Sequence, residues 1–256
     1  MKTTKAISAL LIFTGIVNFT IAQDGPPPPA TANGGVPPTG YFEVGIGAAQ
    51  PVNSFAREEG TAYGGYALPG TNLNLSFGIP IAHSNFGIAL MYNFVLNPYD
   101  INTYVDNVQM TDQNNTYIPV AQDAYRESFI LGGLFATIPI QRVSLDFRLM
   151  GGLAICGLPE VDYTEDATSV TASQNFEWDT YSSTSTSFAT DMGVNIRFRI
   201  NRTSIMAGVD YLHADPMVST TQQYTDQYGS STYSHIGGML PISVMSYSIG
   251  IGYQFW

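Results

Sequence analysis

Alternation with a period of two is the feature that most constrains this chain. The last eleven residues, SYSIGIGYQFW, place large apolar or aromatic residues such as Tyr247, Ile249 and Phe255 on one side and Ser, Gly and Gln on the other. A period of two indicates a β-strand with two different faces. A strand with one solvated face alternates apolar with polar residues, and charged side chains would be expected there. The segment therefore predicts a strand whose second face is small and neutral.

The same alternation recurs along the chain and predicts eight strands. The expected strands are residues 42–49, 73–79, 86–94, 125–138, 143–155, 188–199, 205–211 and 246–255. Residues 125–138 are ambiguous, since both faces are apolar or glycine. After residue 22 no window of 18 residues is apolar, which excludes a transmembrane helix there, but a transmembrane β-strand needs only about 9–11 residues.

The connections between these segments alternate in length. The short ones are 79–85, 138–142 and 200–202, and the long ones are about 50–70, 97–124, 157–187 and 213–241. Short turns at one end and long loops at the other are typical of an up-and-down barrel threaded through a membrane. The long loops are rich in Tyr, Ser and Thr, which suits either extended hairpins or a binding surface.

The two faces of the strands predict lipid outside the barrel. A soluble barrel buries its large apolar face and shows long charged side chains to water. Here the second face carries Gly, Ala, Ser and Asn with a few charges, which fits the interior of eight strands, just wide enough for side chains. We therefore expect an all-β, eight-stranded antiparallel transmembrane barrel with at most a narrow ion path.

The N-terminus predicts secretion. Lys2, Lys5 and the apolar run that follows have the pattern of a signal peptide over residues 1–22, with cleavage near Ala22/Gln23. Residues 23–40 are rich in Pro and Gly and predict a periplasmic linker, and residues 41–256 form the barrel. The mature chain keeps seven arginines against 20 acidic residues, a net charge of −13. Such a chain is not expected to bind nucleic acid.

No cofactor or metal site is expected. The single Cys156 excludes an internal disulfide and a cysteine-based metal cage, and no calcium-loop spacing is present. The long loops concentrate the acidic residues, which predicts either a solvated negative surface or loose binding of divalent cations that bridge to lipopolysaccharide.

Inward-facing charges form the candidate site. Near-balanced charges in a narrow lumen predict pairing, because an isolated buried charge is costly. The preferred pair is Asp146 with Arg197, and the second is Arg148 with Asp191 or Glu43. Such a network either rigidifies the barrel or acts as a gate for small ions. The full set is Glu43, Asp146, Arg148, Asp191, Arg197, Arg199 and Asp210.

The eight strands, the asymmetry of the loops and the aromatic C-terminus YQFW resemble the small bacterial outer-membrane barrels of the OmpA-transmembrane-domain and OmpX type, the "porin family". The resemblance covers residues 40–256. It implies a monomer in contact with outer-membrane lipid and lipopolysaccharide, with short turns in the periplasm and long loops outside. It also implies that Tyr253, Phe255 and Trp256 form the signal read by the barrel-assembly machinery.

The expected function is structural, adhesive or envelope-related, and no catalysis is expected. One alternative is a membrane subunit of a surface or secretion complex, recruited through the Pro-rich segment or the loops. Another is an enzyme that modifies outer-leaflet lipid. His213 with Asp215 at the outer rim and Ser234-His235 in the last loop are its candidates, but no spacing in the sequence places a serine beside His213.

Overall fold

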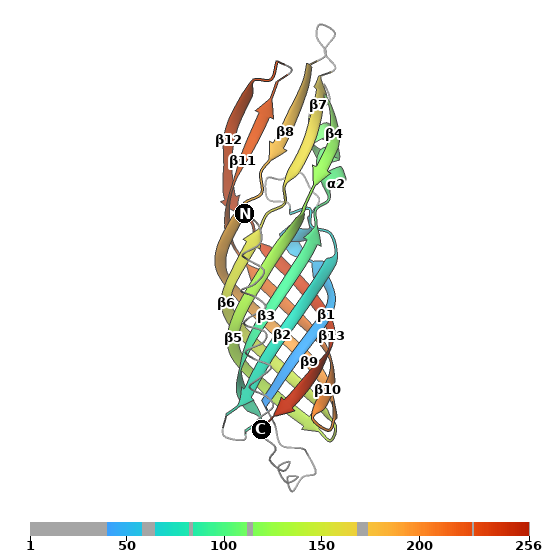
Figure 1. The fold of residues 1–256 in the computed structure, drawn as a ribbon, viewed down its shortest axis with the longest axis vertical. Coiled ribbons are helices and arrows are strands. Elements are labelled where there is room, and N and C mark those ends of the chain that lie inside the picture. Colours follow the sequence, from blue (N-terminus) through green and yellow to red (C-terminus); the bar gives the residue numbers. More distant parts are fainter. Residues whose placement is uncertain are drawn as a thin grey trace, which may run out of the picture.

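The computed structural model describes residues 40–57, 65–81, 84–111, 115–167, 174–226 and 228–255. Eight antiparallel strands close into a barrel in the order β1-β13-β10-β9-β6-β5-β3-β2 (Figure 1). Each expected strand lies within one of them, so the predicted fold is confirmed. Their bounds are β1 Gly40–Pro51, β2 Gly70–Pro80, β3 Phe86–Pro98, β5 Ala124–Ile140, β6 Val143–Gly157, β9 Thr184–Ile200, β10 Thr203–Ala214 and β13 Ile242–Phe255. The proposed signal peptide, nearly all of the linker and Trp256 lie outside the described residues.

The last strand closes the barrel against the first. β13 pairs with β1 from Gly40 opposite Phe255 to Pro51 opposite Val244. At the same end, two-residue turns join β5 to β6 and β9 to β10. Gln141 and Asn201, which begin these turns, have φ of 55° and 58°. This left-handed conformation is uncommon outside glycine, and Asn adopts it more readily than most residues.

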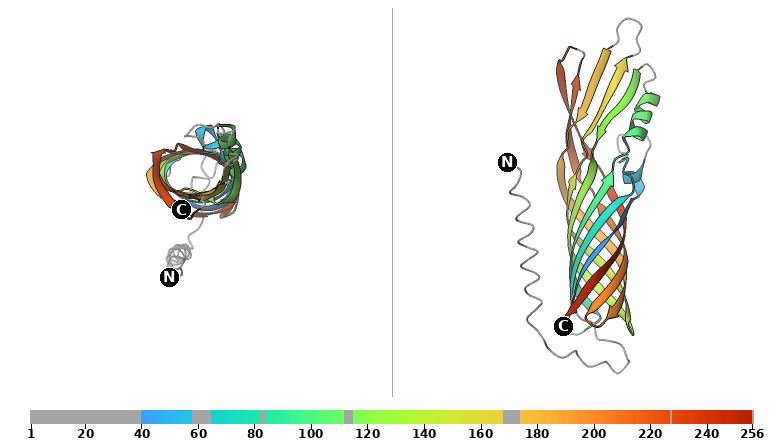
Figure 2. Two further views of the ribbon diagram at one scale, coloured as in Figure 1. Left: turned by 90° about the horizontal axis from the view of Figure 1, so that it is seen from above. Right: turned by 45° about the vertical axis from the view of Figure 1, so that its right-hand side comes forward.

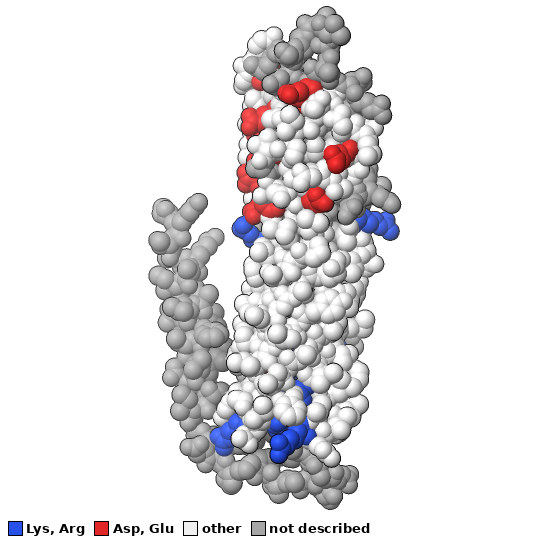
Figure 3. All heavy atoms as spheres, turned by 90° about the vertical axis from the view of Figure 1, so that its right-hand side faces the viewer, with Lys and Arg blue, Asp and Glu red and all other residues white. Residues whose placement is uncertain are grey.

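The bulky faces of the strands point out of the barrel. Leu90 is 64% exposed, Phe147 43% and Ile249 67%. On the face shown in Figure 3, a broad band without charged side chains separates basic residues at the turn end from acidic residues at the other end. An apolar surface of this extent is not stable against water. The wall therefore fits hydrocarbon, with every barrel strand paired on both sides.

The lumen is less uniform than the sequence predicts. Along β5 the inward positions hold Phe129, Leu131 and Phe135, all nearly fully buried, so the expectation of a lumen of small residues is wrong on this wall. Glycine on the neighbouring strand makes room for these rings. A Cβ added at Gly87 would lie 2.2 Å from the Phe135 ring. The space that this large inward ring needs is thus left free by a glycine, which has no side chain, on the neighbouring strand.

The long connections fold into a second sheet that stands beyond the barrel (Figures 1 and 2). Its order is β12-β11-β8-β7-β4. The hairpins β7–β8 and β11–β12 match the expected extended hairpins. The bounds are β4 Asn115–Gln122, β7 Val161–Ala167, β8 Gln174–Thr180, β11 Met217–Thr225 and β12 Ser231–Met239.

Two short helices, which the sequence analysis does not predict, lie near the barrel mouth and beside the outer sheet. The 3-10 helix η1 is Asn53–Ala56, and α2 is Ile101–Thr111, which packs beside β4. Asp100 caps α2, because the Thr103 backbone N–H donates to its Oδ1 at 3.1 Å. Among the described residues, neither helix has the length and apolar character needed to span a bilayer.

Aromatic rings connect the barrel mouth to the outer sheet. The Phe55 and Tyr125 ring centroids are 4.9 Å apart at the mouth. Tyr163 of β7 stacks on Trp178 of β8 at 6.0 Å, and Trp178 contacts Tyr224 of β11 at 4.8 Å. Aromatic pairs of this kind add about 0.5–1.5 kcal/mol each beyond buried area. The outer sheet therefore has a packed aromatic face of its own.

Candidate functional site

The lower lumen is organised around Arg197 on β9. Its Nε donates to Glu43 on β1, and its Nη2 lies 3.0 Å from Asp146 Oδ2 on β6, close enough for an ion pair although not aligned as a hydrogen bond. The guanidinium also sits 4.0 Å above the centre of the Tyr41 ring. Thr137 Oγ1 donates to Asp146 Oδ1 at 2.6 Å. The structure thus brings the preferred pair, Asp146 and Arg197, together.

The middle of the lumen is organised around Arg148 on β6. Its Nη2 lies 2.6 Å from Asp210 Oδ1 and 3.2 Å from Asn195 Oδ1, and its Nη1 donates to Ser76 Oγ at 3.4 Å. The direct partner of Arg148 is therefore Asp210 and not Asp191 or Glu43 as expected, although Asp191 lies close enough to Arg148 to interact with it electrostatically. Arg148 bonds Asn195 on the neighbouring strand β9, and its long side chain also reaches past β9 to Asp210 on β10 and across the lumen to Ser76 on β2.

Two buried carboxylates form neither a salt bridge nor a hydrogen bond among the described residues. Asp191 on β9 and Glu127 on β5 are 0% exposed, and neither carboxylate has a hydrogen-bond partner in the described structure. The sequence analysis misses Glu127, because it lies in the ambiguous segment 125–138. The structure places Glu127 on the same inward face as Phe129 and Leu131, but alternation gives no signal for it because the opposite face is apolar as well.

The remaining predicted residues lie at the turn end. Arg199 is half-buried, and its backbone N–H donates to the Arg142 carbonyl at 2.8 Å. The Tyr253 hydroxyl accepts a hydrogen bond from Arg202 at 3.4 Å. The Phe255 ring stacks on Phe77 with centroids 5.5 Å apart. The role of the C-terminal aromatics in barrel assembly stays a prediction.

The contacts in the lumen join several strands through charged side chains and therefore favour a rigid barrel. Four carboxylates with 0% exposure interact with two guanidiniums that are each 4% exposed, and these carboxylates are Glu43, Asp146, Asp191 and Asp210. Each guanidinium is held by residues from at least two other strands, so its position is fixed. Buried pairs of this kind contribute little net stability but are costly to break.

The outer rim contains a contact that the sequence analysis misses. His213 at the end of β10 has its Nε2 3.3 Å from Asp215 Oδ2 and its Nδ1 3.0 Å from Ser243 Oγ. Ser243 lies directly opposite His213 on the neighbouring strand β13. The sequence spacing does not place a serine beside His213, and the pairing of β10 with β13 supplies one. Ser243 is only 2% exposed, and Tyr211 donates a hydrogen bond to its hydroxyl at 3.3 Å.

The outer sheet has an acidic face around β7 and β8. Asp162 on β7 lies directly opposite Asp179 on β8, and Thr164 lies opposite Glu177. Partial burial raises the pKa of Asp162 above its ordinary value, and the neighbouring carboxylates of Asp179, Glu160 and Glu177 raise it further.

The other face of this sheet is aromatic and holds one carboxylate in place. Glu165 accepts hydrogen bonds from Trp178 Nε1 at 2.8 Å and from Asn115 Nδ2 at 2.7 Å. Across the described ranges, no group of three His, Cys, Asp or Glu side chains is arranged to hold a metal ion.

A closed eight-stranded barrel with an apolar exterior and a charged lumen has the fold of the outer-membrane β-barrel proteins, as the sequence predicts. No protein-family model matches the sequence, and no curated protein matches it. Similar solved structures are neisserial surface protein A (13% identity over 84% of this chain and 97% of that chain, TM-score 0.46) and the Yersinia pestis attachment invasion locus protein Ail (16%, 85% and 100%, TM-score 0.36). The Escherichia coli outer membrane protease OmpT is also similar (9%, 86% and 98%, TM-score 0.35).

Proposed function

We propose that this chain is an adhesive protein of the bacterial outer membrane, in which the barrel is the anchor and the outer sheet binds a partner. The observation that carries the proposal is the free edge of β12. Within the described residues β12 pairs only with β11. Its residues from Ser231 to His235 are all exposed, and the strand contains neither Pro nor a carboxylate, Lys or Arg.

The opposite edge of the sheet differs. β4 contains Pro119, its pairing with β7 shifts register between Pro119 and Ala121, and α2 packs beside it. Proline, register breaks and covering elements are the devices that prevent an edge strand from pairing. Because β12 has none of them, it favours addition of an extended segment from a partner. The acidic face of β7 and β8 favours a partner segment with basic residues.

Adhesion tests this proposal. Cells displaying the chain are applied to surfaces coated with matrix proteins, and the double variant Tyr233→Lys/His235→Lys is expected to bind about tenfold less, because lysines on an edge strand oppose strand addition. The matched control is Thr221→Lys/Gln223→Lys. Those positions pair with the same two residues but belong to β11, whose backbone is already paired on both sides.

The two variants separate the possible outcomes. Retained binding in the control and lost binding in the edge variant support strand addition, whereas equal binding by both variants and the wild type rejects it. Crosslinking in intact membranes is the companion measurement. A constant membrane partner recovered with the chain would instead favour a subunit of a surface or secretion complex.

The rim contact favours a second candidate function, acyl transfer. A serine hydroxyl beside a histidine that is itself paired with a carboxylate is the arrangement that activates a nucleophile. In this role His213 would take the proton of Ser243 Oγ, which attacks the carbonyl of an acyl ester of outer-leaflet lipid, while Asp215 orients the ring. The ester C–O bond would break, the lipid alcohol would leave with the proton from His213, and water would then hydrolyse the acyl-serine. The burial of Ser243 beneath Tyr211 requires that ring to move first.

Labelling with a fluorophosphonate tests this second candidate. Labelled Ser243 is expected in the wild type, with labelling lost in Ser243→Ala and His213→Ala. Tyr211→Ala is expected to label faster, because it uncovers the hydroxyl. Ser185→Ala, which changes a nearby serine that bonds the Met217 carbonyl, serves as the control. No labelling in the folded wild type or in Tyr211→Ala would assign Ser243 a purely structural role.

A further inference from the structure

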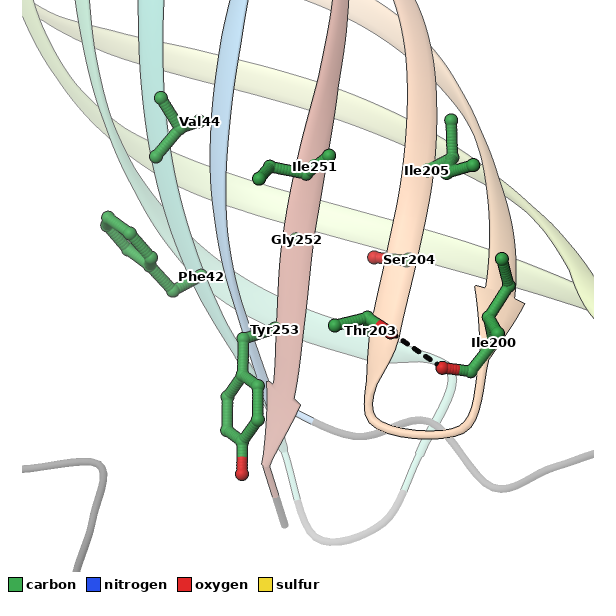
Figure 4. Close-up of a pocket in the computed structure, with 9 residues that line it drawn as sticks. All are labelled: Phe42, Val44, Ile200, Thr203, Ser204, Ile205, Ile251, Gly252 and Tyr253. Carbon is green, nitrogen blue, oxygen red and sulfur yellow. Dashed lines mark hydrogen bonds between the residues drawn. The ribbon is translucent and has the colours of Figure 1, made fainter.

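A groove of about 390 Å³ crosses the outer wall of the barrel near the tight turns (Figure 4). Val44, Ile251 and Ile205 form one side, and Phe42, Tyr253 and Thr203 form the other. These side chains come from the adjacent strands β1, β13 and β10. The groove is therefore part of the surface that faces hydrocarbon.

The register of the strands explains the groove. Tyr253 lies opposite Thr203, and Ile251 lies opposite Ile205, with the pair Gly252 and Ser204 between them. Ser204 and Gly252 lie on the face that points into the lumen. The floor of the groove on the outer wall is therefore formed by their backbone. On the lumen side this pair is closely packed, because a Cβ at Gly252 would lie 2.6 Å from Ser204 Oγ. Thr203 adds no free hydroxyl, since its Oγ1 donates to the Ile200 carbonyl at 2.8 Å.

The foot of the groove is basic. Arg202, in the turn that follows Ile200, donates to the Tyr253 hydroxyl at 3.4 Å. Arg142 lies in the adjacent turn, where its carbonyl bonds the Arg199 N–H. In the described part of this end, the nearby carboxylates of Glu43 and Asp146 are enclosed in the lumen with 0% exposure. Among the described residues, the charged side chains exposed at this end are therefore basic, as Figure 3 shows for one face.

We propose that the groove binds one anionic phospholipid of the leaflet at the turn end, with an acyl chain in the groove and the phosphate at Arg202 and the Tyr253 hydroxyl. Arginine forms strong charge-assisted hydrogen bonds with phosphate oxygens, and tyrosine is favoured where hydrocarbon meets water. The combination of an apolar groove and a basic foot selects a ligand that has both an acyl chain and a negative headgroup.

Native mass spectrometry of the barrel released from micelles tests this site. The barrel is incubated with equal amounts of phosphatidylglycerol and phosphatidylcholine, and the wild type is expected to retain the anionic lipid about fivefold better. Arg202→Gln is expected to abolish that preference. Thr203→Phe and Val44→Phe, which fill the groove from opposite sides, are expected to reduce retention of both lipids.

Arg142→Gln is the matched control, because it removes the same charge from the adjacent turn, outside the groove. Retained preference in this variant, with loss in Arg202→Gln, supports a defined site. Equal loss in the two arginine variants, or no change in Arg202→Gln, overturns it. Heat-modifiable migration on gels establishes that each variant is folded. The outer sheet takes no part in this experiment, so its result is independent of the adhesive proposal.

Discussion

Replacing Arg148 by methionine is expected to destabilise the folded barrel by about 3–5 kcal/mol, because it leaves a buried charge without its partner. Asp210 is 0% exposed, and its Oδ1 lies 2.6 Å from the guanidinium. Asp191, which already lacks a hydrogen-bond partner, would also lose its favourable electrostatic interaction with the Arg148 guanidinium. The free energy of unfolding is measured by urea titration in lipid vesicles, followed by circular dichroism.

Two further variants show whether pairing is the cause. Arg148→Met/Asp210→Asn is expected to recover at least half of the loss, since the second change removes the orphaned charge. Arg126→Met is the control, because its ion pair with Asp123 is exposed and should be worth less than about 1 kcal/mol. If Arg148→Met costs no more than Arg126→Met, the lumen pair is not a structural element.

The sequence predicts the barrel well because the two faces of its strands meet different surroundings, hydrocarbon on the outside and the lumen on the inside. Mostly bulky apolar residues occupy every second position where hydrocarbon meets the wall, so the pattern is visible in seven strands without any tertiary information. The exception is β5, where Phe129 and Phe135 face inward while Ile130 and Leu134 face outward. Both faces are then apolar, and the period of two disappears from the sequence although the strand is regular.

The partners of the charged lumen residues can be predicted from the sequence only where the two residues lie on neighbouring strands, at heights that can be counted from tight turns. Asp146 and Arg197 lie on the neighbouring strands β6 and β9 at similar heights above two-residue turns, so counting from the turns places them together. Arg148 and Asp210 are separated by β9. Their contact depends on the stagger of the closed barrel and on the length of an arginine side chain. The alternation of apolar and polar residues in the sequence gives neither the stagger of the strands nor the reach of this side chain across the lumen.

The outer region is the part that sequence reasoning describes least. Composition identifies extended hairpins, since Thr and Tyr favour strands, but the order β12-β11-β8-β7-β4 depends on pairing between connections far apart in the chain. The contact between His213 and Ser243 has the same origin. Those two residues meet because β10 and β13 pair in one register, and no short turn fixes that register.

Ile249→Arg is expected to destabilise the barrel by about 2–4 kcal/mol in lipid vesicles, the cost of arginine facing the centre of a bilayer. Ile249 is 67% exposed near the middle of β13, on the wall that we assign to hydrocarbon. Ile118→Arg is the matched control. Ile118 is also an isoleucine on a strand and is 45% exposed, but it lies on β4 in the outer sheet.

The comparison of these two isoleucines distinguishes lipid from water without any knowledge of a ligand. If the barrel wall contacts hydrocarbon and the outer sheet contacts water, only the first substitution carries the cost of burying a charge in lipid. Urea titration of both variants in the same vesicles measures the difference. Equal costs at both positions would contradict a membrane-embedded wall, because exposure alone treats the two sites alike.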